Sequence, residues 1–397
     1  MRRHHKRGLL AIPLAGALFL AACGGDDGGS AATTTSAGGE GSTTAAAGAK
    51  DVNLKGTCPD TIVVQTDWNP EAEHGALYQL MGANPKVDTN KKTVTGPLVA
   101  AGGKDTGVQL QIRVGGPAIG FQQVTAQMYQ DKDILLGYTA TDEAVQNSIE
   151  QPTKAIVAPL DINPQIIMWD PGTYPDVQKI ADLKAKDAKI RYFEGGAYMD
   201  YLLGAGLVAK SQLDASYDGT PAVFVSQQGK VAQQGFASAE PYIYKNEVKE
   251  WAKDVKFQLI HDTGWQPYAA PLGVRSADFD KNKACFAKLV PIIQQAQVDF
   301  IKSPDKANTL MLSLIEQYNT GWVYSAGVAK YSVEEQLKLG LVGNGPDQTL
   351  GNFDMQRVDD FIAKATPIFT AGGKDVKEGL KSSDVATNEF IDPSIHL

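Results

Sequence analysis

The sequence predicts an α/β fold built as two lobes, each a mostly parallel sheet flanked by helices, with two segments crossing between them. From Cys58 onward, short apolar runs alternate with helical stretches, which is typical of α/β proteins. Two stretches, 155–171 and 256–274, each hold two apolar runs broken by prolines and polar residues, as expected where a chain passes between lobes. The 397 residues, 43% of them hydrophobic, are enough for two domains.

The first residues are typical of an export signal. A basic head (1–7) precedes an apolar run (8–20) and the letters "LAAC", which end at Cys23. The apolar run is too short to span a bilayer as a permanent helix. "LAAC" followed by two glycines resembles the lipobox of bacterial lipoproteins, whose cysteine is diacylated after cleavage. We therefore expect a signal peptide over 1–22 and a lipid anchor at Cys23 on the extracytoplasmic side of the membrane. The alternative is a plain secretory signal with an unmodified cysteine.

A flexible linker is expected to follow, over 23–57. Residues 24–50 are almost wholly Gly, Ala, Ser and Thr, which cannot bury a core, and such a coil spans roughly 30 Å. Four of the 37 basic residues lie in the signal, so the mature chain carries 33 basic against 45 acidic side chains. That balance, without a basic cluster, argues against nucleic-acid binding.

The two remaining cysteines, Cys58 and Cys285, are expected to form a disulfide, because an exported protein matures in an oxidising compartment. The alternative is two free thiols. With no other cysteine and no His/Cys spacing, we expect no metal site and no cofactor.

Strands and helices can be placed from the apolar pattern. The predicted strands are 61–65, 108–114, 134–138, 155–160, 165–169, 189–192, 255–260 and 269–274. The predicted helices are 76–81, 124–130, 142–149, 177–184, 198–207, 240–251, 280–301, 303–318, 333–339 and 354–370. The crossings make 165–262 an inserted second lobe, and leave 58–164 and 263–397 as a discontinuous first lobe. The helices of the last third would pack on an existing sheet.

Polar or glycine-rich loops follow several of these strands, where ligands bind in open α/β sheets. They read "TDWNPEAEH", "GGPAIG", "TATDEA" and "FEGGAYMDY", and a similar stretch, "GFASAEPYIY", starts the helix at 240. Each alone could be an ordinary turn. "GGPAIG" matches neither a dinucleotide fingerprint nor a phosphate loop. Five such loops over two lobes predict a ligand site between them.

No catalytic set is evident. The mature-chain histidines, His74, His261 and His396, are far apart in sequence, and "GxSxG" and "HExxH" are absent. Sequence order does not exclude a Ser-His-Asp site, but nothing selects one. We interpret His74 as a hydrogen-bonding contact of a ligand rather than as a base.

Four segments together resemble ABC-transporter solute-binding proteins of the group that binds sulfonates, nitrate, taurine and thiamine-pyrimidine precursors. They are "TDWNPEAEHGALYQ", "GGPAIGF…TAQMYQDKDILLGYTATDEAV", "ASAEPYIYKNE" and "HDTGWQPYAAPLGVRSADF". The resemblance implies the type II periplasmic-binding-protein fold and a monomer that closes on a small solute. The closed form would deliver the solute to an ABC permease and its ATPase. An enzymatic branch consumes its own histidine and carries a cysteine-rich motif, which this chain lacks.

The resemblance leans toward the thiamine-precursor side and implies two facing walls. The first-lobe wall would comprise Trp68, Asn69, His74, Gly115, Gly116, Pro117, Tyr138, Thr139, Thr141 and Asp142. The second-lobe wall would comprise Glu194, Gly195, Gly196, Tyr198, Glu240 and Tyr242, and Trp265 lies in the second crossing.

These residues suggest a flat ligand, with the aromatic rings stacking on it and Glu194 and Glu240 accepting hydrogen bonds or balancing a positive charge. The loops hold no clear arginine, which speaks against a small oxyanion. Arg113, Arg191 or helix N-termini could still serve an anion. Two other interpretations remain, an exported enzyme on this scaffold and a sensing or structural lipoprotein without a transporter.

Overall fold

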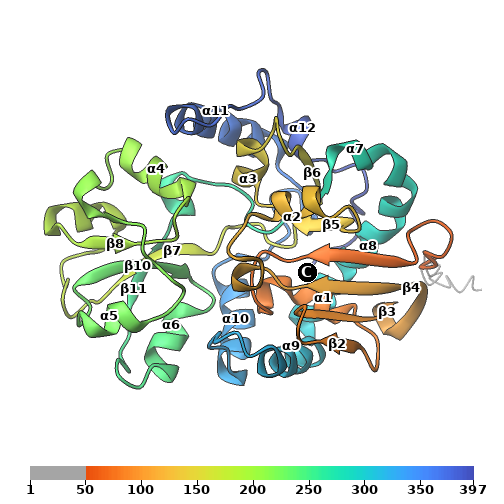
Figure 1. The fold of residues 1–397 in the computed structure, drawn as a ribbon, viewed down its shortest axis with the longest axis horizontal. Helices are drawn as coiled ribbons and strands as arrows, with labels where there is room; N and C mark the ends of the chain where they lie inside the picture. The colour runs from red at the N-terminus through yellow and green to blue at the C-terminus, as the bar shows by residue number, and fades with distance from the viewer. Residues whose placement is uncertain (1–50) are drawn as a thin grey trace, which may run out of the picture. The chain divides into compact units, whose positions relative to one another are not determined.

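The computed structural model describes residues 51–397, which contain two β-sheets (Figure 1). The predicted signal, Cys23 and most of the linker lie outside the described residues and stay predictions. The seven-stranded sheet has the order β2-β3-β4-β1-β5-β12-β6, and the five-stranded sheet has the order β11-β7-β10-β8-β9. The strands of the first sheet are β1 Thr61–Gln65, β2 Lys86–Asp88, β3 Thr93–Ala100, β4 Lys104–Arg113, β5 Leu136–Tyr138, β6 Thr153–Val157 and β12 Leu272–Arg275. Those of the second are β7 Gln165–Trp169, β8 Lys189–Arg191, β9 Leu213–Asp214, β10 Val231–Phe236 and β11 Lys256–Leu259.

Both sheets are mixed, which corrects the prediction of mostly parallel sheets. Strand β1 pairs in parallel with β4 and β5, and β8 pairs in parallel with β9 and β10. Strands β2, β3, β6, β7, β11 and β12 make antiparallel pairs. For β3 and β4, the short connection between the strands explains the antiparallel pairing. Strands β3 and β4 are joined only by Ala101–Gly103, where Gly102 and Gly103 have φ of 70° and 73°, and so short a link returns the chain antiparallel.

Helices pack around each of the two sheets (Figure 1). They are α1 Gly75–Gln79, α2 Val124–Gln130, α3 Thr141–Gln146, α4 Ala197–Gly204, α5 Ala222–Ser226, α6 Glu240–Tyr242, α7 Ser276–Phe279, α8 Lys283–Lys302, α9 Asp305–Tyr318, α10 Ala326–Lys338, α11 Met355–Ala371 and α12 Ser382–Val385. Among the described residues, no helix is both long and apolar enough to cross a bilayer.

Strand β1 is buried on both faces. Its side chains alternate between the two faces and so join two different apolar clusters. Ile62 and Val64 join the core formed with α1, α8 and α9, whereas Val63 packs in a smaller cluster with Val124 and Met128 of α2. The polar loop that follows β1 therefore leaves from the centre of the seven-stranded sheet.

The folded body begins before Cys58. Leu54 is fully buried, and its backbone N–H donates to the Thr106 carbonyl at 2.8 Å. Lys288 on α8 donates to the Asp51 carboxylate and to the Asn53 carbonyl, both at 2.9 Å. Residues 51–57 are thus packed on the seven-stranded sheet rather than belonging to a flexible linker.

The predicted disulfide between Cys58 and Cys285 is confirmed. It joins residues 227 positions apart and ties the segment before β1 to helix α8.

We expect the Cys58→Ser/Cys285→Ser double variant to lose about 2–5 kcal/mol of unfolding free energy, because the crosslink restricts the unfolded chain. Urea unfolding with and without reductant measures this. Reductant should lower the wild-type midpoint and leave that of the double variant unchanged, and equal midpoints for both proteins would contradict the expectation.

Helix α11 holds the two crossing segments together. Arg357 donates to the carbonyl and carboxylate of Asp161 in the first crossing, at 2.9 and 3.1 Å. It also donates to the Gln266 carbonyl in the second crossing at 3.0 Å and lies 4.1 Å from the Tyr268 ring centre. Strands β7 to β11 form one sheet and the others form the second, an arrangement on which we base the proposal of lobes at 165–262 and at 58–164 with 263–397.

Candidate functional site

Two adjoining cavities lie where strand ends of the two sheets face each other. The aromatic cavity, about 160 Å³, is lined by Asp67, Trp68, Glu71, Gln165, Phe193, Tyr217, Gln234, Gly235, Phe236, Ala239, Glu240 and Trp322. The polar cavity, about 230 Å³, is lined by Asp67, Gln123, Ala140, Asp142, Glu143, Gln146, Asn163, Gln165, Gly195, Gly196, Ala197, Tyr198, Phe236, Ile260, Trp265, Ala269 and Phe369. They share Asp67, Gln165 and Phe236, so we treat them as one site.

Asp67 lines both cavities, and its carboxylate contacts the buried side chain of His74. The His74 Nε2 and an Asp67 carboxylate oxygen are 2.6 Å apart, and the His74 side chain is 1% exposed whereas that of Asp67 is 37% exposed. The His74 ring lies 4.8 Å from the buried Tyr138 ring. His74 lines neither cavity, and its Nε2 contact can hold the Asp67 carboxylate at their junction.

Trp68 forms one wall of the aromatic cavity and touches rings from three other segments. Its ring centre lies 5.5 Å from Phe193, 5.9 Å from Phe121 and 5.9 Å from Trp322. Phe193 follows β8 of the five-stranded sheet, so these contacts span the two sheets. Phe121 is 53% exposed at a φ of 58°, a strained conformation for a residue with a Cβ.

The glycine pair predicted from "GGPAIG" lies directly against Trp68. A Cβ on Gly116, whose φ is +55°, would stand 2.5 Å from Cε3 of Trp68. A Cβ on Gly115 would stand 2.2 Å from the Thr66 carbonyl oxygen. Pro117 is the second residue of the 3-10 turn Gly116–Ile119. The loop thus shapes the wall by close backbone approach but does not line either cavity.

The opposite wall comes from β10 and the start of α6. The Glu240 carboxylate accepts from the Phe236 N–H at 2.6 Å, and Gly235 leaves room for that side chain against the strand. Gln234 accepts from the Tyr198 hydroxyl at 2.5 Å and from the Phe193 N–H at 2.7 Å. These bonds fix the side chains that face Trp68.

The other predicted site residues fall into three groups. Asp142, Gly195, Gly196, Tyr198 and Trp265 line the polar cavity. Asn69, Tyr138, Thr139 and Thr141 are buried and line neither cavity; Asn69, for example, accepts from the Thr320 hydroxyl at 2.8 Å. Glu194 is exposed, and the Tyr242 ring packs 5.4 Å from Tyr331 of α10, so these two residues also line neither cavity.

Several lining residues were not among the predicted site residues. Glu71 and Phe193 lie in loops that were singled out, "TDWNPEAEH" and "FEGGAYMDY", where a period-two or helical pattern gives no reason to choose them. Tyr217 follows the short strand β9, and Trp322 lies between α9 and α10, where no strand-end signal exists. Their positions depend on tertiary packing that local sequence does not encode.

Burial raises the pKa of several carboxyl groups in the site. Glu240 is 7% exposed, and its burial raises its pKa to about 7. Burial likewise raises the pKa of Glu143 to about 7 and that of Glu71 well above its usual value. Glu73, whose pKa burial also raises, accepts a hydrogen bond from the Ser238 hydroxyl that follows β10. Carboxylates from both walls therefore share one poorly solvated region.

We expect the Glu240→Gln variant to gain stability over the wild type as pH rises from 5 to 8. The pKa of Glu240 is raised above the unfolded value, so its stabilising effect is present at low pH and lost as pH rises through about 7. The difference should approach at most about 3 kcal/mol. Partial burial lowers the pKa of His261 to about 4, which acts in the opposite direction in both proteins and cancels in the comparison. Urea midpoints at four pH values measure it, and a difference that is constant with pH would contradict it.

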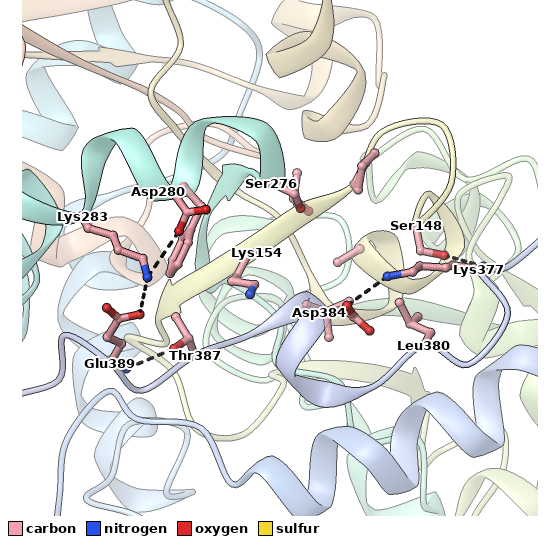
Figure 2. Close-up of a pocket in the computed structure, with 15 residues that line it drawn as sticks. Ser148, Lys154, Ser276, Asp280, Lys283, Lys377, Leu380, Asp384, Thr387 and Glu389 are labelled. Carbon is pink, nitrogen blue, oxygen red and sulfur yellow. Dashed lines mark hydrogen bonds and ion pairs between the residues drawn. The ribbon is translucent and has the colours of Figure 1, made fainter.

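A third and larger cavity, about 520 Å³, lies at the edge of the seven-stranded sheet beside β6, α7 and α12 (Figure 2). Two of its three lysines pair with carboxylates. Lys283 pairs with Asp280 and Glu389, both at 3.3 Å, and Lys377 pairs with Asp384 at 3.0 Å. No strand of the five-stranded sheet contributes to it, so we do not assign the solute site there.

The described residues contain no group of three or more His, Cys, Asp and Glu side chains that could hold a metal ion.

No protein-family model and no curated protein match the chain. Among solved structures, a protein of Bordetella bronchiseptica RB50 aligns with a TM-score of 0.51 at 15% identity, over 83% of this chain and 95% of that one. The periplasmic nitrate-binding protein NrtA from Synechocystis PCC 6803 aligns with a TM-score of 0.50 at 12% identity, over 83% and 87%. The alkanesulfonate-binding protein SsuA from Xanthomonas axonopodis pv. citri, bound to MOPS, gives 0.49 at 11% identity, over 83% and 99%. At such identities the likeness shows the fold alone, and the predicted two-lobed fold of periplasmic binding proteins is confirmed.

Proposed function

We propose that the protein is the extracytoplasmic solute-binding component of an ABC importer. It captures a small, flat, nitrogen-containing ligand, such as a thiamine-pyrimidine precursor, between its two sheets and delivers it to a membrane permease and its ATPase. Hinge closure at the two crossing segments would enclose the ligand, and the acylated Cys23 would keep the protein near its permease.

One observation carries this proposal, the pair of adjoining cavities between the strand ends of the two sheets. Rings from separate segments, among them Trp68, Phe193 and Trp322, supply flat apolar surfaces for a ligand ring. Polar groups such as Asp67 and Asn163 can fix its orientation by hydrogen bonds. The described residues around the two cavities offer no nucleophile paired with a base, which supports binding without turnover.

A small oxyanion is the second candidate, because NrtA, which has this fold, is a nitrate-binding protein. The lining disfavours it. Within residues 51–397, no lysine or arginine lines either cavity, and Arg113 and Arg191 pair with Asp131 and with the Ser216 carbonyl. The buried carboxyl groups of this site offer an anion no positive charge and would repel it whenever they are ionised.

A thermal-shift panel on the full chain in detergent tests the function, with pyrimidines, thiamine, flavins, taurine, alkanesulfonates and nitrate as compounds. A ligand at 100 times its Kd should stabilise the protein by about 2.7 kcal/mol. A rise in Tm with heteroaromatic compounds, which are then recovered unchanged, supports the proposal. A rise only with the anions favours the second candidate, a flat response counts against both, and turnover would indicate an enzyme.

A further inference from the structure

The aromatic cavity brings together three carboxyl groups, those of Asp67, Glu71 and Glu240. Asp67 is paired with His74, and Glu240 accepts from the Phe236 N–H. Glu71 differs from both. It is 4% exposed and lines the cavity, and within residues 51–397 its carboxylate has no hydrogen-bond donor and no cation as a partner.

Ionising a buried carboxyl group without a partner is costly, and burial accordingly raises the pKa of Glu71; a cation that enters the cavity would favour its ionised form. The charged groups nearest to Glu71 are Glu73, Asp67 and Glu240, all of which disfavour its ionised form. The nearby cation Arg191 is engaged elsewhere, because it donates to the Ser216 carbonyl at 2.7 Å and packs over the Tyr217 ring. The described residues thus bring three carboxyl groups to this cavity without a free cation to balance their charge once they ionise.

The walls of the cavity suit a cation as well. Trp68, Phe193, Tyr217 and Trp322 all line it. Aromatic ring faces attract ammonium, pyridinium and similar groups, and the attraction is largest where water is excluded. Aromatic rings and a buried carboxylate can together replace the hydration shell of an organic cation. They could not replace the hydration shell of an oxyanion.

We propose that the solute is an organic cation whose positive group lies in the aromatic cavity beside Glu71 and Glu240. The cavity, at about 160 Å³, has room for a compact head group such as an N-alkylated aromatic ring or a trimethylammonium group. The neighbouring polar cavity, where Gln123 and Asn163 supply amide groups, takes the remainder of the molecule. This inference rests on the proposed function and adds the charge of the ligand to it.

Probes matched in shape but not in charge test the inference, by calorimetric titration of the full chain in detergent. N1-methylnicotinamide, nicotinamide and nicotinate share one ring as cation, neutral molecule and anion, and choline and 3,3-dimethylbutanol form a second pair. We expect at least one cation to bind about tenfold or more tightly than its uncharged partner. Glu71→Gln and Glu240→Gln should each reduce that preference about tenfold. Glu335→Gln, which replaces a buried carboxylate outside both cavities, should leave the preference unchanged.

Neutral or anionic members that bind as tightly as their cationic partners in both series would overturn the inference. So would a cation preference that survives both cavity variants, or a complete lack of binding by all five probes. Each of these results leaves the proposed function standing if a compound of the thermal-shift panel binds. Failure of that panel together with failure of the probes would remove both.

Discussion

The Trp68→Ala variant is expected to bind the solute about 10- to 100-fold more weakly than the wild type. The Trp68 ring contacts the rings of Phe121, Phe193 and Trp322, so its loss opens the wall of the aromatic cavity that spans the two sheets. Aromatic anchors in desolvated pockets commonly carry this much of a binding free energy. Titration with the tightest compound found in the panel measures the change.

The conservative variant Trp68→Phe provides the control, because it keeps a ring in the wall and should recover part of the affinity. Melting temperatures of both variants separate loss of binding from loss of folding. Trp68 is only partly buried and belongs to no core cluster, so the fold should survive. Affinity that is unchanged in Trp68→Ala would show that the solute lies elsewhere.

Replacing Gly116 by alanine should damage the same wall without removing any ring. The new Cβ would stand 2.5 Å from Cε3 of Trp68, and the backbone would hold alanine at a φ of +55°. The left-handed conformation costs about 1 kcal/mol, and the clash must push the indole away from its present position. We expect an affinity loss of about tenfold together with lower stability.

Gly120 is a matched control four residues further along the same loop. Its φ is +63°, and a Cβ there would meet nothing within 4 Å. Gly120→Ala should therefore show the backbone cost alone, with nearly unchanged affinity. Equal affinity losses in the two variants would mean that the loop backbone, and not the position of Trp68, controls binding.

The sequence could locate strands wherever an apolar run coincided with the strand. Strands β1 and β7 were predicted with the bounds that the structure shows. Strand β10, "VAQQGF", was missed because Gln233, Gln234 and Gly235 interrupt its apolar pattern. These glutamines are buried through hydrogen bonds to Tyr244 and Tyr198, partners that are visible only in the folded chain.

Strand β3, "TVTGPLVA", was missed for a related reason, because glycine and proline inside a run favour a turn. The structure accommodates Pro97 at an irregularity in the pairing with β4, and Gly96 packs tightly against Met81 and Pro85. In the site, the sequence indicated which loops matter but not which side chains face the cavities. Glu194 and Glu240 were equal candidates by pattern, and only the fold turns Glu240 inward.

The most direct test of a solute site between the sheets is native mass spectrometry of the full chain purified from its own cells. Wild type and Trp68→Ala should be purified and measured together. The account predicts that the wild type carries one equivalent of a small organic compound, which is released as a cation, and that the variant has lost it. A compound retained in full by Trp68→Ala, or a wild-type protein that carries no compound, would contradict the account.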